Sequence, residues 1–210
     1  DLHSTSRRQR QMCIRDSGKT TTTHIIGHIL RAQEYKVGII GTVHVMIGDK
    51  TYPIHNTTPD VVDLQHILSQ MVAEGVTHCI MEVSSHALAL NRVAGVEYDT
   101  AVFTNLTQDH LDFHKTFENY LAAKCKLFEQ VSAPNQHKKN KGAVINIDDP
   151  YGERVMAKNS APLITYGTKG KGTLEGENLT ITAKTSAYDI VYEGKEYPIH
   201  MRITGLFNVC

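Results

Sequence analysis

The sequence has no tryptophan, and its 210 residues include only four cysteines. These cysteines lie far apart and form no C-x-x-C pair, which argues against a disulfide framework or a thiolate zinc site and indicates free thiols in a reducing compartment. No apolar run reaches the roughly 18 residues that a membrane span needs, and no signal peptide with an apolar core is recognisable. We therefore expect a cytoplasmic protein without membrane insertion.

An excess of charge of one sign is also lacking, because 22 Lys and Arg residues balance 22 Asp and Glu residues. This balance argues against a nucleic-acid-binding protein built on a basic face, and against an acidic disordered tail. The composition, 40% hydrophobic and 21% charged, is typical of globular proteins. The length suffices for one large domain or two small ones with a buried core. We expect a globular enzyme.

Residues 1–17 differ from the rest of the chain, because they contain an arginine cluster and no hydrophobic period. Such a cluster can be a targeting signal. However, the string R-Q-M-C-I-R-D-S resembles translated sequencing-adaptor sequence. We interpret residues 1–17 as a foreign, disordered extension and exclude them from the analysis of the fold.

From Gly18 onward, compact apolar runs alternate with segments of helical period. Residues 172–204 instead form short apolar segments separated by Gly and Pro, which indicates antiparallel strands. The alternation predicts an α/β fold, a P-loop-type and mostly parallel sheet with flanking helices and a small antiparallel excursion near the C-terminus. We expect helices at 18–33, 60–74, 117–130 and from about 149, strands at 36–41, 78–83, 100–105, 142–147 and 163–166, and a hairpin within 44–55. Asp60 is a suitable cap for the helix at 60–74, whose period predicts one apolar face with Val61, Leu64, Ile67, Leu68 and Met71. In the helix at 117–130, we expect the buried side chains to be Tyr120, Ala123, Leu127 and Phe128.

The segment Gly18-Lys19-Thr20-Thr21 opens the first predicted helix. In a phosphate-binding loop, backbone N–H groups and the helix N-terminus face phosphate oxygens, the lysine adds a positive charge, and the threonine hydroxyl binds Mg²⁺. The full pattern needs a glycine five residues before Gly18, where the sequence has Cys13. The alternative is an ordinary helix start with an exposed lysine.

Polar residues follow two neighbouring predicted strands where ligands of α/β sheets bind, at the carboxyl ends. Glu82 follows the strand at 78–83 and can hold Mg²⁺. His110 and His114 follow the next strand with helical spacing, but a zinc metalloprotease would need Glu directly after the first His, and the sequence has Leu there. We favour His110 as a ligand and His114 as a capping or surface group.

The predicted helix at 117–130 carries Lys124 and Lys126. Composition alone predicts that both lysines are solvated. The small residues Ala122 and Ala123 directly before Lys124 would let that side of the helix approach a site closely.

Four motifs occur in a fixed order, and together they resemble the central ATP-binding domain of the Mur ligases. They are N-T-T-P-D (56–60), M-E-V-S-S-H-A-L (81–88), F-T-N-L-T-Q-D-H-L-D-F-H (103–114) and Y-x-x-A-K-x-x-L-F (120–128). The resemblance covers residues 18–210. It implies an ATP-dependent amide ligase of peptidoglycan precursor synthesis, in the branch that adds a diamino acid to UDP-MurNAc-L-Ala-D-Glu through an acyl phosphate.

The resemblance also implies roles for individual residues. Those that would bind ATP are Gly18, Lys19, Thr20 and Thr21, and those that would bind Mg²⁺ are Thr20, Glu82 and His110. Those that would contact the UDP-MurNAc-dipeptide are Asn56, Thr57, Thr58, Ser84 and Arg92. Lys124 matches a lysine that this family carbamylates to N6-carboxylysine, a group that can bind Mg²⁺ where an ammonium would repel it. Lys19 and Lys124 would therefore be catalytic.

The chain departs from the family pattern in the phosphate loop and at its ends. The family loop reads G-T-N-G-K-T-T, whereas Arg15-Asp16-Ser17 stands here for the first three residues. Asp16 would bring a negative charge toward the phosphates, and Arg15 cannot make the glycine turn without strain. We interpret residues 18–204 as the central domain and 205–210 as the start of a hinge. The N-terminal uridine-binding domain and the C-terminal domain, which selects the diamino acid, are absent, so we expect no turnover by this chain alone.

Three alternatives stay open at this point. One is a related ATP-dependent ligase such as folylpolyglutamate synthetase, although Ser84-Ser85-His86 and N-T-T-P-D favour the cell-wall branch. Another is a non-catalytic nucleotide-binding α/β module, in which Lys124 would be exposed and unmodified and Glu82 and His110 would lie more than about 10 Å apart. A zinc protein is the least favoured.

Overall fold

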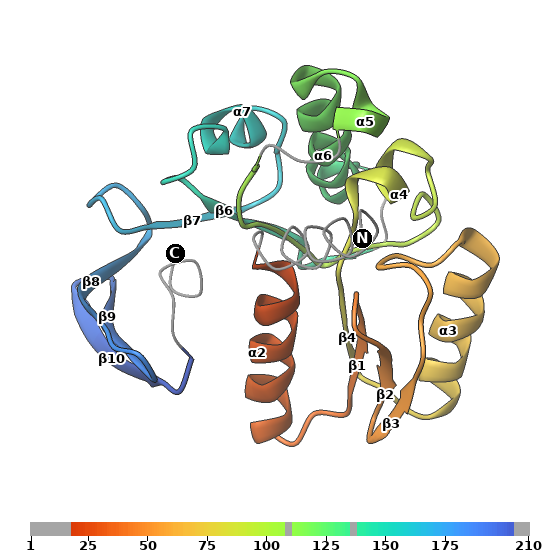
Figure 1. Cartoon of the computed structure of the whole chain (residues 1–210), viewed down its shortest axis with the longest axis horizontal. Helices are drawn as coiled ribbons and strands as arrows, with labels where there is room; N and C mark the ends of the chain where they lie inside the picture. Colours follow the sequence, from red (N-terminus) through yellow and green to blue (C-terminus); the bar gives the residue numbers. More distant parts are fainter. Residues whose placement is uncertain (1–17, 108–110, 135–137, 204–210) are drawn as a thin grey trace, which may run out of the picture. The chain divides into compact units, whose positions relative to one another are not determined.

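In the computed structural model, the described residues are 18–107, 111–134 and 138–203. They divide into two compact units, one ending at Gly95 and one beginning at Val96 (Figure 1). The predicted ATP-binding domain spans both units, and the predictions for residues 1–17 and 205–210 lie outside the described residues. No helix in the described part of the chain is both long and apolar enough to span a membrane.

The first unit is a four-stranded sheet with the strand order β3-β2-β1-β4. Strands β1 and β4 are parallel, and β1, β2 and β3 form an antiparallel meander that contains the predicted hairpin. Every helix and strand predicted for this part of the sequence is confirmed. The elements are α2 (Lys19–Ala32), β1 (Val37–Ile40), β2 (Val45–Ile47), β3 (Lys50–Tyr52), α3 (Val61–Ala73), β4 (His78–Met81) and α4 (Ser85–Ala89).

Helices α2 and α3 cover opposite faces of this sheet (Figure 1). Successive residues of β1 point to opposite faces, as in any strand. A Cβ atom at Gly27 of α2 would lie 2.8 Å from Cδ1 of Ile39, and a Cβ atom at Gly38 would lie 2.6 Å from the sulfur of Met71 on α3. Glycine at these two positions therefore allows both helices to pack closely on β1.

One expectation for α3 is wrong. The helical period placed Val61 on the buried face together with Leu64 and Met71, and those two residues are buried. Val61 is 50% exposed. It is the first residue of the helix, where a side chain has a neighbouring helical turn on one side only.

The second unit is a six-stranded sheet with the strand order β10-β9-β8-β7-β6-β5. Strands β5 to β8 pair in parallel, and β8, β9 and β10 form the predicted antiparallel excursion. The elements are β5 (Thr100–Phe103), α5 (Leu111–His114), α6 (Phe117–Ser132), β6 (Gly142–Asn146), α7 (Gly152–Met156), β7 (Leu163–Gly167), β8 (Leu174–Ile181), β9 (Ser186–Tyr192) and β10 (Lys195–Met201). Both units thus confirm the α/β fold class.

Helix α6 provides the core of the second unit. Its residues Tyr120, Ala123 and Phe128 are buried as expected. The Phe128 ring packs edge-on against Phe103 of β5, with 6.4 Å between ring centroids. The helix begins after Thr116, whose hydroxyl accepts a hydrogen bond of 3.2 Å from the Asn119 N–H. This anchoring fixes the helix that carries Lys124.

Candidate functional site

A buried carboxylate, that of Glu82, is the centre of the predicted site in the first unit. Glu82 directly follows β4 and is 2% exposed. Its Oε2 accepts hydrogen bonds from the hydroxyls of Thr20 and Thr42, both at 3.0 Å, and its Oε1 accepts one from the Thr42 N–H, also at 3.0 Å. Burying a carboxylate is unfavourable unless its oxygens have such partners. The network therefore keeps Glu82 in place beside the start of α2.

The parallel pairing of β1 with β4 brings Thr42 and Glu82 together. In the register of the two strands Ile40 is opposite Met81, so the residues that follow each strand lie at the same edge of the sheet. Between them, a Cβ atom at Gly41 would collide with the Glu82 carboxylate. Thr42 was not predicted as a site residue, because a threonine shortly after a strand is not distinctive until the register of β1 with β4 is known.

The start of α2 has the geometry of an anion-binding helix terminus. Gly18 occupies the N-cap with a left-handed backbone (φ 66°), and as a glycine it has no side chain with which to cap the helix. The Thr22 N–H and hydroxyl both donate to the Gly18 carbonyl at 2.9 Å. The first turn contains no acidic residue. Lys19 and Thr21, both partly exposed, lie in this turn with Thr20, as the phosphate-loop prediction requires. Residues 15–17 lie outside the described residues.

Three of the residues predicted to bind substrate join the Glu82 network. Thr58 is 1% exposed. Its hydroxyl donates to the Glu82 carbonyl and accepts from the Ser84 N–H, each at 2.9 Å. The Thr57 hydroxyl accepts a hydrogen bond of 3.2 Å from Thr42. The structure thus brings the N-T-T-P-D and M-E-V-S-S-H segments together.

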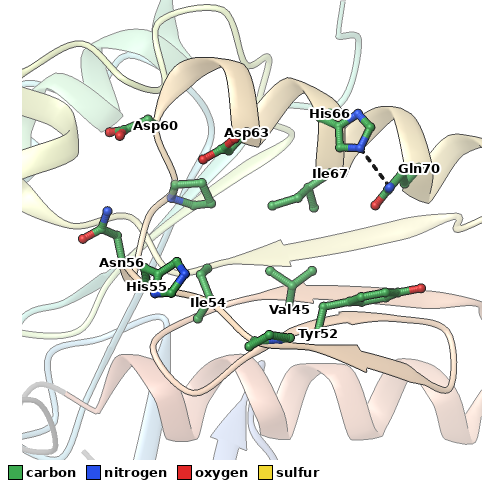
Figure 2. A pocket seen from close by; sticks show the side chains of 12 residues that line it. Val45, Tyr52, Ile54, His55, Asn56, Asp60, Asp63, His66, Ile67 and Gln70 are labelled. Carbon is green, nitrogen blue, oxygen red and sulfur yellow. Dashed lines mark hydrogen bonds between the residues drawn. The ribbon is translucent and has the colours of Figure 1, made fainter.

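The two other residues predicted to bind substrate, Arg92 and Asn56, have different surroundings. Nε of Arg92 lies 3.0 Å from Oδ1 of Asp60. Asn56 is exposed and lines a cavity of about 230 Å³. Figure 2 shows this cavity between the β2–β3 hairpin and α3, with Val45 and Ile67 facing one another across it.

His24 lies one helical turn after Thr20, and its imidazole ring is 5.4 Å from that of His44. Burial, followed by the positive charge that His44 can carry, lowers the pKa of His24 below its ordinary value of 6.5, although Glu82 acts in the opposite direction. His24 is therefore neutral beside the start of α2 at pH 7.

In the second unit, Lys124 lies on α6 and contacts a carbonyl and an aromatic ring. Its Nζ donates to the Asn105 carbonyl at 3.2 Å and lies 5.2 Å from the centroid of the Tyr120 ring. Composition alone predicted that both lysines of this helix are solvated. Lys126 is exposed, whereas Lys124 is partly buried, because the contacts with Asn105 and Tyr120 draw its side chain toward the carboxyl end of β5.

The two histidines predicted after β5 have different outcomes. His110 lies outside the described residues, so its role as a ligand stays a prediction. The expectation of a surface group is wrong for His114, because its side chain is buried and stacks on Tyr120 with 5.2 Å between ring centroids. Within 18–107, 111–134 and 138–203, no three His, Cys, Asp or Glu side chains converge on a possible metal site. The zinc alternative gains no support from these residues.

The oxygen atoms around Glu82 are suited to a hard cation. Mg²⁺ prefers carboxylate and hydroxyl oxygens and usually takes only one or two carboxylates from the protein, together with phosphate oxygens. Glu82 supplies one carboxylate, and Thr20 supplies a hydroxyl 3.0 Å from it. These residues therefore fit a magnesium ion held at the phosphates of a nucleotide.

Comparisons with known proteins show the family of the chain. The family model of the Mur ligase middle domain matches residues 17–210. The chain is 46% identical over 193 residues to UDP-N-acetylmuramoyl-L-alanyl-D-glutamate–2,6-diaminopimelate ligase of Bacillus cereus, and 47% identical over 193 residues to the ligase of the same name from Geobacillus thermodenitrificans. These matches cover 92% of this chain but only 39% and 40% of the relatives. The chain thus spans about two fifths of their length.

Solved structures extend the agreement to the fold. A structure of UDP-N-acetylmuramoyl-L-alanyl-D-glutamate–2,6-diaminopimelate ligase superposes with a TM-score of 0.81 at 29% identity, covering 91% of this chain and 39% of that one. The apo form of FPGS from L. casei superposes with a TM-score of 0.62 at 12% identity, over 91% of this chain and 52% of that one, which is a likeness of fold alone. Because the family model matches residues 17–210, the chain belongs to the Mur ligase middle-domain family.

Proposed function

We propose that this chain is the nucleotide-binding part of an ATP-dependent, ADP-forming ligase that joins a diamino acid to UDP-MurNAc-L-Ala-D-Glu. The observation that supports it most directly is the hydrogen bond between Thr20, at the start of α2, and the buried carboxylate of Glu82. It joins a phosphate-binding helix start to a cation-binding carboxylate. ATP and a UDP-linked substrate are cytoplasmic metabolites, so the proposal places the reaction in the bacterial cytoplasm.

In this proposal the first turn of α2 binds the ATP phosphates. Backbone N–H groups and Lys19 would face the phosphate oxygens, while Thr20 and Glu82, with His110, would hold Mg²⁺. Bound Mg²⁺ would neutralise negative charge on the phosphates. Catalysis of phosphoryl transfer depends mainly on such positioning and electrostatic stabilisation, which a preassembled network of hydrogen bonds provides.

The N-T-T-P-D segment and Arg92 would hold the acceptor substrate. A planar guanidinium matches a carboxylate well. In the first step, an oxygen of the D-glutamyl carboxylate attacks the γ-phosphorus, and ADP leaves. In the second, the diamino acid nitrogen attacks the acyl carbon, loses a proton, and inorganic phosphate leaves. Thr57, Thr58 and Ser84 would orient the acceptor, with Asn56 at the edge of the cavity.

Lys124 is proposed to act as a carbamate. Carbon dioxide adds to the neutral amine, which loses a proton and becomes an anionic carboxylate on nitrogen. A group of this charge can join a magnesium site, whereas an ammonium cannot. The position of Lys124 supports the proposal, because its Nζ lies beside the Asn105 carbonyl, two residues after β5, and its side chain is partly buried.

A chimaeric enzyme would test this function. Residues 18–203 replace the matching segment of the Bacillus cereus diaminopimelate ligase, with that protein's own phosphate loop kept before Gly18. We expect ATP-dependent joining of diaminopimelate to UDP-MurNAc-L-Ala-D-Glu with release of one phosphate per amide. A folded chimaera that binds both substrates and forms no amide would contradict the proposal. Amide formation by the 210-residue chain alone would contradict our expectation that it needs its neighbouring domains.

A further inference from the structure

Asp60 occupies the N-cap of α3 but does not cap it. Its carbonyl accepts the first helical hydrogen bond, from the Leu64 N–H at 2.8 Å, but its carboxylate accepts none from the first turn of the helix. By contrast, the N-cap side chains of Ser84 and Thr116 each accept a backbone hydrogen bond at 3.2 Å. An N-cap aspartate normally does the same. The Asp60 carboxylate is instead directed at Arg92.

The backbone of Arg92 is fixed by the end of α4. Asn91, with φ 55°, has the left-handed conformation that asparagine tolerates better than most residues. The Arg92 N–H donates to the Ala87 carbonyl at 2.9 Å, and the Asn91 N–H donates to the Leu88 carbonyl at 3.3 Å. This is the Schellman arrangement that terminates a helix. Because the backbone is set, the remaining freedom of Arg92 lies in its side chain.

Asp60 restricts that side-chain freedom. The ion pair joins Oδ1 of Asp60 to Nε of Arg92 at 3.0 Å, and the side chains are 62% and 25% exposed, respectively. Nε is the inner nitrogen of the guanidinium, so this contact does not require the two terminal nitrogens, which carry four of the five N–H donors. An arginine held through Nε can still present its terminal nitrogens to a ligand carboxylate.

The position of Asp60 ties this ion pair to the residues proposed to bind the acceptor. Asp60 is two residues after Thr58, which holds the Glu82 carbonyl and the Ser84 N–H. It also lines the cavity that Asn56 lines. The segment from Asn56 to Asp60 thus contacts the 82–92 segment at both ends, through Thr58 and through Asp60.

We propose that Asp60 is a positioning residue that orients the Arg92 guanidinium for recognition of a carboxylate on the acceptor substrate. This inference rests on the proposed function. Stability alone does not explain the pair, because exposed ion pairs contribute little to folding and because serine or asparagine at this position could cap the helix, which the Asp60 carboxylate does not do. The carboxylate of Asp60 is therefore needed to orient the Arg92 guanidinium.

The test compares four variants of the 210-residue chain with the unsubstituted chain. D60N and D60S keep a residue that favours the N-cap but remove the charge, D60E keeps the charge, and D49N removes a charge from the exposed turn between β2 and β3. Two quantities are measured: the NMR signal of the Arg92 Nε–H group, and the affinity for UDP-MurNAc-L-Ala-D-Glu in an NMR titration. A second titration with UDP-MurNAc-L-Ala, which lacks the D-glutamyl carboxylates, is the ligand control.

We expect D60N and D60S to shift the Arg92 signal and to weaken binding of the dipeptide substrate by at least about tenfold, the loss typical of a misplaced charge-assisted hydrogen bond. D60E should restore part of the affinity, and D49N should leave both quantities unchanged. Affinity for UDP-MurNAc-L-Ala should be the same in all five chains. Melting temperatures of D60N, D60S and D49N should agree, since each keeps a residue at position 60 that favours the N-cap.

Each contrary result has its own meaning. An Arg92 signal that D60N leaves in place would overturn the ion pair and the inference, whatever the ligand does. A shifted signal with unchanged dipeptide affinity would overturn the positioning role and leave the proposed function standing. Tighter binding in D60N would show that Asp60 competes with the substrate, which also overturns the inference. Failure of the unsubstituted chain to bind the dipeptide substrate would contradict the proposed function itself, and with it the positioning role of Asp60.

Discussion

The two units of the chain hold their candidate functional groups in opposite ways. In the first, the Glu82 carboxylate is buried and receives hydrogen bonds from two hydroxyls and a backbone N–H. In the second, Lys124 is partly buried and contacts a carbonyl and an aromatic ring. Glu82 is therefore part of a hydrogen-bond network that supports the fold. The contacts of Lys124 instead mainly set the direction of its side chain. Substitutions should affect stability and activity together in the first unit and activity alone in the second.

The largest effect is expected for Glu82. E82Q keeps the shape of the side chain but removes the charge, and one acceptor oxygen becomes a donor facing the Thr20 and Thr42 side. We expect the ligase rate of the chimaera to fall by at least about 100-fold, as when an electrostatic group is lost from an active site. Steady-state kinetics measure this, with E74Q, at an exposed position of the same unit, as the control. An E82Q rate within a few-fold of the parent would remove Glu82 from the site.

Lys124 should give a similar loss of activity without a loss of stability. K124M keeps the length of the side chain, and we expect a fall in rate of at least about 100-fold with a free energy of unfolding within about 1 kcal/mol of the parent. K126M, at the exposed lysine of the same helix, should change neither. Labelled bicarbonate should mark Lys124 and not Lys126 after chemical trapping of the carbamate. A labelled Lys126, or an active K124M chimaera, would contradict the proposed role of Lys124 and the difference between the two units.

Substitution of Thr58 should show how much the hydrogen-bond network around Glu82 contributes to the stability of the fold. T58V has nearly the same shape but leaves the Glu82 carbonyl and the Ser84 N–H without their shared partner. We expect a loss of about 2 to 4 kcal/mol, because each unsatisfied buried group costs about 1–3 kcal/mol. T58S should retain most of the stability. Chemical denaturation of the 210-residue chain measures both, and T58V as stable as T58S would show that the network does not support the fold.

The smallest expected effect is the pH dependence due to His24. Because burial lowers its pKa below 6.5 in the folded chain, the unfolded chain binds the proton more readily, and stability must fall as the pH drops below that value. H24Q should remove this part of the pH dependence, while H28Q, at an exposed position of α2, should not. Denaturation midpoints measured on both sides of pH 6.5 would show the difference. Parallel pH profiles for the parent and H24Q would contradict it.

The sequence predicted the elements of both units well, because hydrophobic period and strand length are local signals. It also indicated Glu82 and Thr20, because a carboxylate after a buried strand and a hydroxyl at a helix start are recognisable chemical patterns. Thr42 was missed, since a threonine after a strand has no distinctive pattern until the register of β1 with β4 is known.

Side-chain direction was the part that sequence could not determine. Asp60 was expected to cap α3, and the helix does begin there, but its carboxylate pairs with a residue 32 positions later in the chain. The choice between a local backbone N–H and a distant guanidinium depends on where the end of α4 places Arg92. Lys124 is a similar case, because helical period alone does not say which lysine of α6 finds the Asn105 carbonyl.

The central claim is that the start of α2 and Glu82 form a nucleotide site, and Mg-ATP binding measured by calorimetry tests it most directly. The chain as it stands is compared with one in which Arg15-Asp16-Ser17 is replaced by Gly-Thr-Asn, and E82Q is made in the second. We expect magnesium-dependent binding of ATP only in the chain with the replaced loop, and its loss in E82Q. Folded protein that binds no ATP with either loop, or binding that E82Q leaves unchanged, would contradict the claim.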